Sequence, residues 1–365
     1  MLVTMTDYIH ATREKVLNNI NKAHDLVKDI VDLYTKKKYQ QIIFVASGSS
    51  YTALQCARNY MCKTLKTDVK ILNPYTFSHY DIDYVTDEHF VVIVSQSGAS
   101  TNCVEALMKL KDRHLNSYVL TGIKECDCAN YADVVLDWGC GIETMGYVTL
   151  GVVSLVVYCM LFAAIAANKL GYSDELEYVK EQITKAMKNH KEVCDKTEAF
   201  YATNEQTLYQ LDRVYVLGSG SNYGTALEGA LKMGETIKVL AVGYEQDEFL
   251  HGPALQLSPK YSAFIIDGGD ETKEHALTVF KGLCKVTANA YMITSQDVDH
   301  PHILHVDDPC DEPFTCLYNL PFFELLADII STKLDSKKDH PLYYEMNKII
   351  DFRTPKWRES HKPAD

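Results

Sequence analysis

The chain has 365 residues, which is enough for one large domain or for two of ordinary size. With 36 Lys and Arg against 49 Asp and Glu, its formal net charge is −13. A chain this acidic is poorly suited to bind a nucleic acid or an anionic membrane surface by charge alone. An anionic ligand would have to be bound locally, by backbone amides and hydroxyl groups.

Eleven cysteines are scattered along the chain without a CxxC pair. This pattern is typical of reduced thiols in a cytoplasmic protein. The first residues also lack the basic stretch, apolar core and cleavage site of a secretory signal. Cys126 and Cys128 are too close together for a usual zinc-binding pair, and no HExxH motif accompanies them. We therefore expect a cytoplasmic protein without a metal site.

In chain order, apolar positions at helical spacing first predict an amphipathic helix over residues 6–34. Short β-rich runs then alternate with helical stretches. Continuous apolar strands separated by helices predict a parallel sheet that is covered on both faces. The runs are 41–46, 68–72, 90–95, 117–121 and 133–137.

An almost wholly apolar segment follows at residues 148–166 and is long enough to cross a membrane. It lacks basic flanks and precedes an acidic run, so we favour a helix buried on all sides and expect no membrane contact. A polar helical stretch then continues to about residue 206. After it come four further strand-like runs and a helix-rich tail; the runs are 213–218, 262–267, 290–294 and 303–306.

The second half repeats the first at an offset of 172 residues. The segment Ser47–Tyr51 (SGSSY) reappears as Ser219–Tyr223 (SGSNY), and the same offset places Ser95 on Asp267 at the end of a second strand. We therefore predict an α/β protein made of two related, doubly wound parallel-sheet halves with three αβα layers. The expected parts are an N-terminal helix, the first half, a connecting helix, the second half and a tail, at residues 1–35, 36–170, 171–206, 207–335 and 336–365.

In open α/β sheets, ligands bind where strands turn into the following helices. At such a turn, Ser95–Ser100 (SQSGAS) places three hydroxyls and an amide at the start of a helix. This favours a phosphate cradle of neutral donors, the alternative being a turn that only caps the helix. The equivalent loop Asp267–Glu271 carries three carboxylates, which would repel phosphate. An anion site is therefore expected in the first half only.

A nucleotide cofactor is not expected. The segment Gly218–Gly224 comes close to the dinucleotide pattern GxGxxG, but its last glycine is one place late. A GxxxxGK[ST] motif is also missing from the sequence. These observations disfavour NAD and ATP, and we predict no cofactor.

The second half offers titratable groups instead. Glu228 and Lys232 are four residues apart on a predicted helix, which makes a surface salt bridge their simplest interpretation. Glu235 lies near the end of that helix, where the helix dipole disfavours a carboxylate. His251 follows sixteen residues later, before Gly-Pro. An acid in this position together with a histidine suggests a catalytic pair.

Taken together, these motifs resemble those of tandem sugar isomerase (SIS) domains over about residues 40–350. The motifs are SGSSY, SQSGAS, EGALKMGE and HGP, in the order and spacing of that family. Such tandems, with flavodoxin-like halves, form the isomerase part of glucosamine-6-phosphate synthase and also the fructosamine-6-phosphate deglycases.

The resemblance implies roles for individual residues. Glu235 would move a proton between C1 and C2 of a sugar, His251 would assist ring opening, and Lys232 would be an active-site lysine. It also implies at least a homodimer, in which the histidine loop can reach the neighbouring subunit's site. The implied phosphate and sugar ligands are Ser95, Gln96, Ser97 and Ser100 for the phosphate, with Ser49 and Ser50 for the phosphate or the sugar hydroxyls.

Three departures from the synthase favour a deglycase. The chain runs from its start directly into the first sugar-binding half, so we expect no glutaminase domain. Its tail has no lysine in the synthase's context, and Leu150 stands where the synthase has a lysine, which leaves Thr149 as a weak sugar contact. A 6-phosphofructosamine, cleaved to glucose 6-phosphate and an amine, fits these losses. The alternatives are a phosphosugar isomerase, an aminosugar-phosphate deaminase or a non-catalytic sugar-phosphate regulator.

Overall fold

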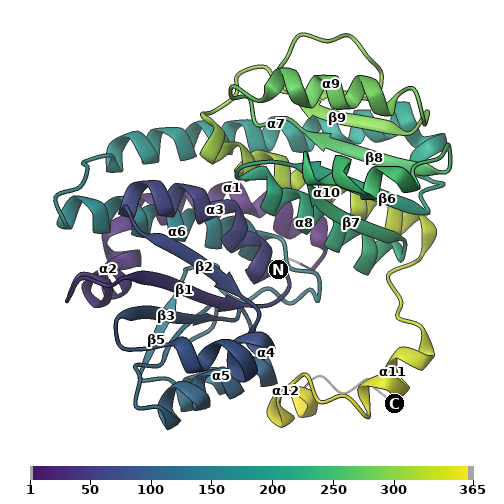
Figure 1. Cartoon of the computed structure of the whole chain (residues 1–365). Coiled ribbons are helices and arrows are strands. Elements are labelled where there is room, and N and C mark those ends of the chain that lie inside the picture. The colour runs from purple at the N-terminus through teal and green to yellow at the C-terminus, as the bar shows by residue number, and fades with distance from the viewer. Residues whose placement is uncertain (1–2, 361–365) are drawn as a thin grey trace.

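The first half is a five-stranded parallel sheet in the order β2-β1-β3-β4-β5, in a computed structural model that describes residues 3–360 (Figure 1). All five predicted strands are confirmed to within one residue at each end. The strands are β1 (Gln41–Ala46), β2 (Asp68–Leu72), β3 (His89–Val94), β4 (Tyr118–Thr121) and β5 (Val134–Asp137).

Helices cover both faces of this sheet, as the continuous apolar strands predict. Because side chains alternate along a strand, Ile42 and Phe44 pack in one apolar cluster while Ile43 and Val45 pack in another. The first cluster includes α3 (Ser49–Leu65) and α6 (Leu150–Lys169), and the second includes α5 (Thr101–Asp112). Short turns complete this half: α4 (Pro74–Thr76), η1 (Phe77–Asp81), η2 (Ile82–Tyr84) and η3 (Asp127–Tyr131).

The predicted N-terminal helix is two helices, α1 (Met5–Asn21) and α2 (Ala23–Tyr34). Lys22 between them has φ −113° and ψ 24°, outside helical geometry. The residues before the break include Asn18, Asn19 and Asn21, and asparagine is a poor helix former. The expectation of one helix was therefore wrong, since the apolar spacing continues across a turn that the spacing itself does not reveal.

The apolar segment after residue 148 forms α6 and is buried on all sides, as predicted. By length and composition α6 and α10 (Glu312–Leu334) could each cross a membrane, but 94% of the apolar window of each is buried inside the fold. Core packing therefore accounts for their composition.

The second half has the same topology, in the order β10-β9-β8-β6-β7. Its strands are β6 (Arg213–Gly218), β7 (Leu240–Glu245), β8 (Tyr261–Ile266), β9 (Ala290–Thr294) and β10 (Ile303–His305). Four were predicted; β7 was missed because it is a partly exposed edge strand containing Gly243. A Cβ there would lie 2.7 Å from the Ala226 carbonyl oxygen, so the glycine permits close packing against α8 (Asn222–Lys232).

The two halves meet where α3 crosses α8. Gly224 permits this approach, because a Cβ there would lie 2.4 Å from the backbone nitrogen of Cys56 on α3. The long helix α7 (Leu176–Leu208) is the predicted connection. The remaining elements of this half are η4 (Met233–Ile237), η5 (Glu248–His251), η6 (Pro253–Gln256) and α9 (Lys273–Leu283).

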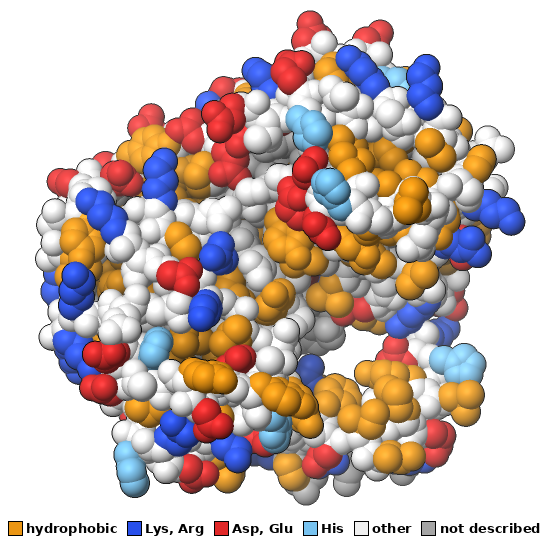
Figure 2. All heavy atoms as spheres, in the orientation of Figure 1, with side chains coloured by type: hydrophobic (Ala, Val, Ile, Leu, Met, Phe, Trp, Pro, Cys, Tyr) orange, Lys and Arg blue, Asp and Glu red, His pale blue; other side chains and the backbone are white. Residues whose placement is uncertain are grey.

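The tail forms an arm that leaves the second half and returns to the first (Figure 1). It carries α11 (Pro341–Asn347) and α12 (Pro355–Ser360). The Thr354 amide donates a hydrogen bond of 3.0 Å to the Ala99 carbonyl, and Arg353 forms an antiparallel bridge with Ser100. Figure 2 shows an opening between this arm and the body of the molecule.

Candidate active site

The centre of the site is a buried acid–lysine network on the seam between the halves. Side chains of Glu228 and Lys232 are each only 1% exposed, with 3.0 Å between Lys232 Nζ and Glu228 Oε1. The predicted surface salt bridge is therefore wrong, because the helix face that carries the pair packs against α3. Ser49, at the start of α3, donates to Glu228 Oε1 at 2.9 Å, and Lys232 Nζ lies 3.1 Å from its hydroxyl. Thr52 donates to the second carboxylate oxygen.

Glu235 is the member of this network that reaches solvent. Its Oε1 accepts a hydrogen bond of 2.6 Å from Lys232 Nζ, while 31% of its side chain is exposed. It lies in the π-helical turn η4, and an extra residue in a turn redirects the side chains that follow it. The sequence correctly indicates an unusual position for this acid, and the structure joins it to Lys232.

The electrostatics of the network suit a proton-transfer group. Burial raises the pKa of the Glu235 carboxyl, and the adjacent Lys232 ammonium acts in the opposite direction. Burial lowers the pKa of Lys232, but Glu228 and Glu235 outweigh it, so the pKa of the lysine lies above its ordinary value. Lys232 thus stays a cation between two carboxylates, and Glu235 is an accessible base of increased basicity.

The predicted phosphate cradle forms a tight turn between β3 and α5. Gly98 has φ +57°, and a Cβ there would lie 2.2 Å from Cys126 Sγ, so the turn requires glycine. Ser97 and Ser100 lie on this turn, Ser100 being the N-cap of α5, and Ser95 is buried at the end of the strand. Arg353 of the arm, which the sequence does not predict, lies beside Ser97 and Ser100.

Two of the predicted ligands, Gln96 and Thr149, are hydrogen-bonded to Glu143. Gln96 Nε2 donates to Glu143 Oε2 at 2.9 Å, and Gly151 leaves room for the Gln96 side chain. Thr149 is fully buried, and its amide and hydroxyl donate to Glu143 Oε1 at 2.8 and 3.0 Å. Glu143 therefore caps α6 and orients the back of the site, a role that no local sequence signal marks.

Ser50 lies in the first turn of α3, next to Ser49, and is half-buried. His251 lies apart from these groups, at the end of η5, with 73% of its side chain exposed and 3.9 Å between its Nε2 and Asp247 Oδ2. Within residues 3–360, no hydrogen bond or ion pair joins His251 to Glu235 or Lys232. The fold of one chain therefore brings together Ser49, Lys232 and Glu235, and leaves the histidine outside.

The second half fills its equivalent anion positions with its own carboxylates. Glu312 Oε1 accepts the Ser221 amide at 2.7 Å, next to Gly220. The Asp267 carboxylate accepts the Gly269 amide at 2.8 Å and the Thr294 hydroxyl at 2.5 Å. In the described residues these carboxylates bind backbone and hydroxyl donors of the second half, and an anion site in the first half alone stays a prediction.

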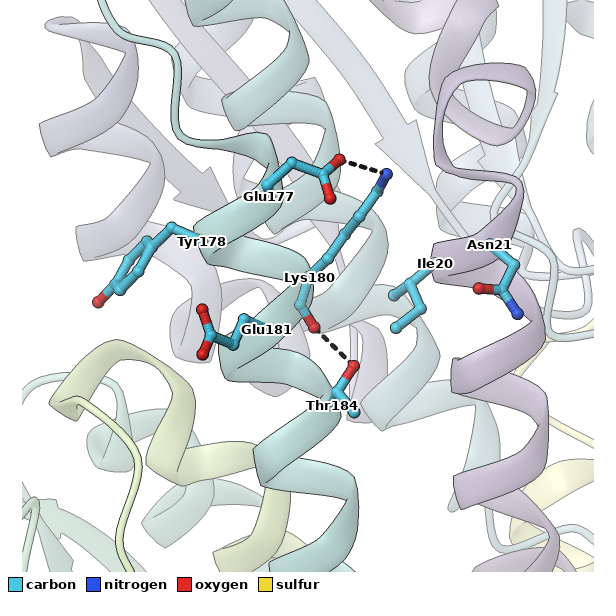
Figure 3. A pocket seen from close by; sticks show the side chains of 7 residues that line it. All are labelled: Ile20, Asn21, Glu177, Tyr178, Lys180, Glu181 and Thr184. Atoms are coloured by element: carbon cyan, nitrogen blue, oxygen red, sulfur yellow. Dashed lines mark hydrogen bonds and ion pairs between the residues drawn. The ribbon is translucent and has the colours of Figure 1, made fainter.

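A groove of about 600 Å³ between α1 and α7 lies away from these residues (Figure 3). Three of its polar residues bind one another: Lys180 pairs with Glu177 at 2.8 Å, and the Lys180 carbonyl accepts the Thr184 hydroxyl at 2.7 Å. Figure 3 shows these side chains lying along the surface of α7 instead of converging on a common point. The groove therefore lacks the arrangement expected of a binding site.

The two sheets, one in each half, define a tandem α/β protein, and the candidate site consists of the hydroxyl-lined turn of the first half and the acid–lysine network on the seam. A family model described as the SIS domain matches residues 33–166 and 207–299, once in each half. The chain belongs to the SIS domain family.

The glutamine–fructose-6-phosphate aminotransferase of Aquifex aeolicus is 23% identical over 334 residues, which cover 90% of this chain and 54% of that protein. The chain spans about half the length of the curated relatives it matches. A Clostridium difficile 630 protein provisionally described as a phosphosugar isomerase has a similar structure, with a TM-score of 0.86, 23% identity and coverage of 94% of this chain and 98% of that one. Tagatose-6-phosphate ketose/aldose isomerase of Escherichia coli also has a similar structure, with a TM-score of 0.74 and 15% identity. The match covers 93% of this chain and 96% of that one. These structural likenesses show the shared fold.

Proposed function

We propose that the chain is a phosphosugar-processing enzyme that cleaves a 6-phosphofructosamine to glucose 6-phosphate and an amine. The observation that carries the proposal is the position of Glu235, the solvent-accessible acid of a buried network that also holds Ser49 of the other half. A base of raised pKa, fixed against a permanent cation, suits abstraction of a proton next to a carbonyl.

In the proposed reaction, the Glu235 carboxylate removes a proton from C1 while a neighbouring acid protonates O2, which gives an enaminol. Glu235 then returns the proton to C2, and the resulting iminium ion loses its N–H proton to that acid's conjugate base. Water hydrolyses the imine, so that the C–N bond breaks, an aldehyde forms at C1 and the free amine departs. Glu235 and the acid are thereby regenerated.

The remaining groups would bind and orient the substrate. The cradle residues Ser95, Ser97 and Ser100 would supply hydroxyl donors for the phosphate at C6, and Ser49 and Ser50 would contact sugar hydroxyls or the phosphate. Phosphate binding far from C1 positions the sugar without taking part in the bond changes. Gln96 and Thr149 would contribute by fixing Glu143 and the start of α6, instead of contacting the sugar directly.

A ketose/aldose isomerase or an aminosugar-phosphate deaminase is the second candidate. It would use the same proton transfer between C1 and C2, and it is favoured by the fold shared with the Escherichia coli isomerase. A regulator that binds a sugar phosphate without turnover would not need Glu235 to be both exposed and basic.

Incubation with fructoselysine 6-phosphate and a panel of related 6-phosphofructosamines tests the proposal. We expect release of glucose 6-phosphate, measured with a coupled dehydrogenase, and no release from the unphosphorylated sugars. Turnover of fructose 6-phosphate or glucosamine 6-phosphate alone would favour the isomerase or deaminase. Binding of these sugars without turnover of any substrate would leave a regulator and overturn the enzymatic assignment.

We further propose that the chain acts in the cytoplasm as a homodimer in which His251 serves the partner's site, because its side chain is exposed and separate from Glu235. Mixing inactive Glu235→Gln with inactive His251→Ala, after dissociation and reassociation, should restore about one quarter of wild-type activity, since half of the dimers are mixed and each regains one site. A mixture of Glu235→Gln with Glu235→Ala should stay inactive. Absence of complementation in a confirmed mixed dimer would exclude sharing of the histidine.

A further inference from the structure

We propose that Arg353, delivered by the C-terminal arm, is the cationic anchor of the substrate phosphate; this inference rests on the proposed phosphosugar substrate. Its Nη1 donates to the Ser97 and Ser100 hydroxyl oxygens at 3.3 and 3.4 Å. Both serines belong to the predicted cradle, more than 250 residues earlier in the chain.

The pairing leaves the cradle able to bind an anion. The two serine oxygens accept hydrogen bonds from the guanidinium, so that their own O–H groups can point to a phosphate oxygen. Nε of Arg353 is buried and has no hydrogen-bond partner. Nε and Nη2 form the edge with which arginine binds oxyanions in a bidentate manner, so a phosphate bound at this edge would supply the acceptor that Nε lacks.

Charge gives the second reason. Among residues 3–360, no ion pair involves Arg353, although the protein carries a net charge of −13. The guanidinium of Arg353 is half-buried and therefore partly removed from water. Burial of a cation is costly unless an anion accompanies it. A phosphate in the cradle would supply the missing counterion, and the arginine would supply the charge that the hydroxyls lack.

The surrounding arm holds the guanidinium in place. Thr354 is buried, its amide donates to the Ala99 carbonyl at 3.0 Å and its hydroxyl donates to Asp127. Thr101 donates to the Asp351 carbonyl at 2.7 Å, and the Arg353 guanidinium lies 5.1 Å from the centre of the Trp357 ring. Backbone pairing and ring contacts therefore fix the arginine on both sides, which is the preorganisation that anion binding requires.

Binding of fructose 6-phosphate and of inorganic phosphate, measured by calorimetry, tests the inference independently of turnover. We expect Arg353→Gln to weaken both by about 10- to 100-fold, with KM raised and kcat little changed for any substrate that is turned over. Arg353→Lys should recover part of the affinity, since it keeps the charge but not the bidentate edge. Thr354→Pro, which removes the hydrogen bond to Ala99, should weaken binding with Arg353 still present.

Arg358→Gln is the matched control, because this arm arginine is exposed and paired with Asp351 at 2.7 Å; we expect it to bind as wild type. Equal affinity of wild type and Arg353→Gln would overturn the role of Arg353 and leave the proposed function intact. Failure of wild type to bind either fructose 6-phosphate or any 6-phosphofructosamine would instead overturn the proposed function, and this inference with it.

Discussion

Replacement of Glu235 by glutamine is expected to lower kcat by about 10²- to 10⁴-fold while the sugar phosphate still binds. Glutamine keeps the size of the side chain and can still accept a hydrogen bond from Lys232, but it cannot take a proton from C1. The measurement is single-turnover release of glucose 6-phosphate, together with loss of the C1 proton to deuterated water. Retained exchange at C1 in the variant would assign the base elsewhere.

The pH profile of the wild type gives a second readout of the same group. Glu235 must be ionised to act as a base, so activity falls as the pH decreases through its pKa. Because burial raises that pKa, we expect the acid limb of kcat/KM above the ordinary value of 4.5. Replacing Glu228 by glutamine removes a neighbouring negative charge that raises this pKa, and should therefore move the limb to lower pH.

Replacement of Lys232 by methionine is expected to lower the free energy of unfolding by about 3–5 kcal/mol at neutral pH. The variant leaves Glu228 buried with 1% of its side chain exposed and without its cation. The hydroxyls of Ser49 and Thr52 still donate to that carboxylate, but they cannot neutralise it. Denaturant unfolding at neutral pH measures the change.

Two further variants identify the cause of the loss. The double variant Lys232→Met with Glu228→Gln should recover much of the stability, because it removes the unpaired buried charge. Lys180→Met, which breaks an ion pair with the exposed Glu177, should cost about 0–1 kcal/mol. If Lys232→Met cost no more than Lys180→Met, the buried pair would contribute no more than a surface pair.

The sheets could be predicted from the sequence because most of their strands are continuous apolar runs. The repeat also aligns strands of one half with strands of the other, which supports both assignments. The edge strand β7 was not predicted, because it is partly exposed and contains Gly243. The break at Lys22 was not predicted either, because two packed helices can share one apolar spacing. Periodicity thus predicts which face is apolar, but not where the chain turns.

The candidate site was predictable only in part. Glu228 and Lys232 have the spacing of a surface pair, and the same spacing serves a buried one; the difference lies in Ser49, which is 179 residues away. Arg353 reaches Ser97 across 256 residues, so no local pattern connects them. Local motifs identify side chains that could act as acids, bases or ligands. The long-range contacts that set the charge state of these side chains come from the fold.

The close contact at Gly224 limits how the two halves can move relative to each other. Backbone of α8 lies against backbone of α3 with no space for even a methyl group, so neither helix can tilt without breaking the network that joins Ser49 to Lys232. The two sheets should therefore move as one rigid body.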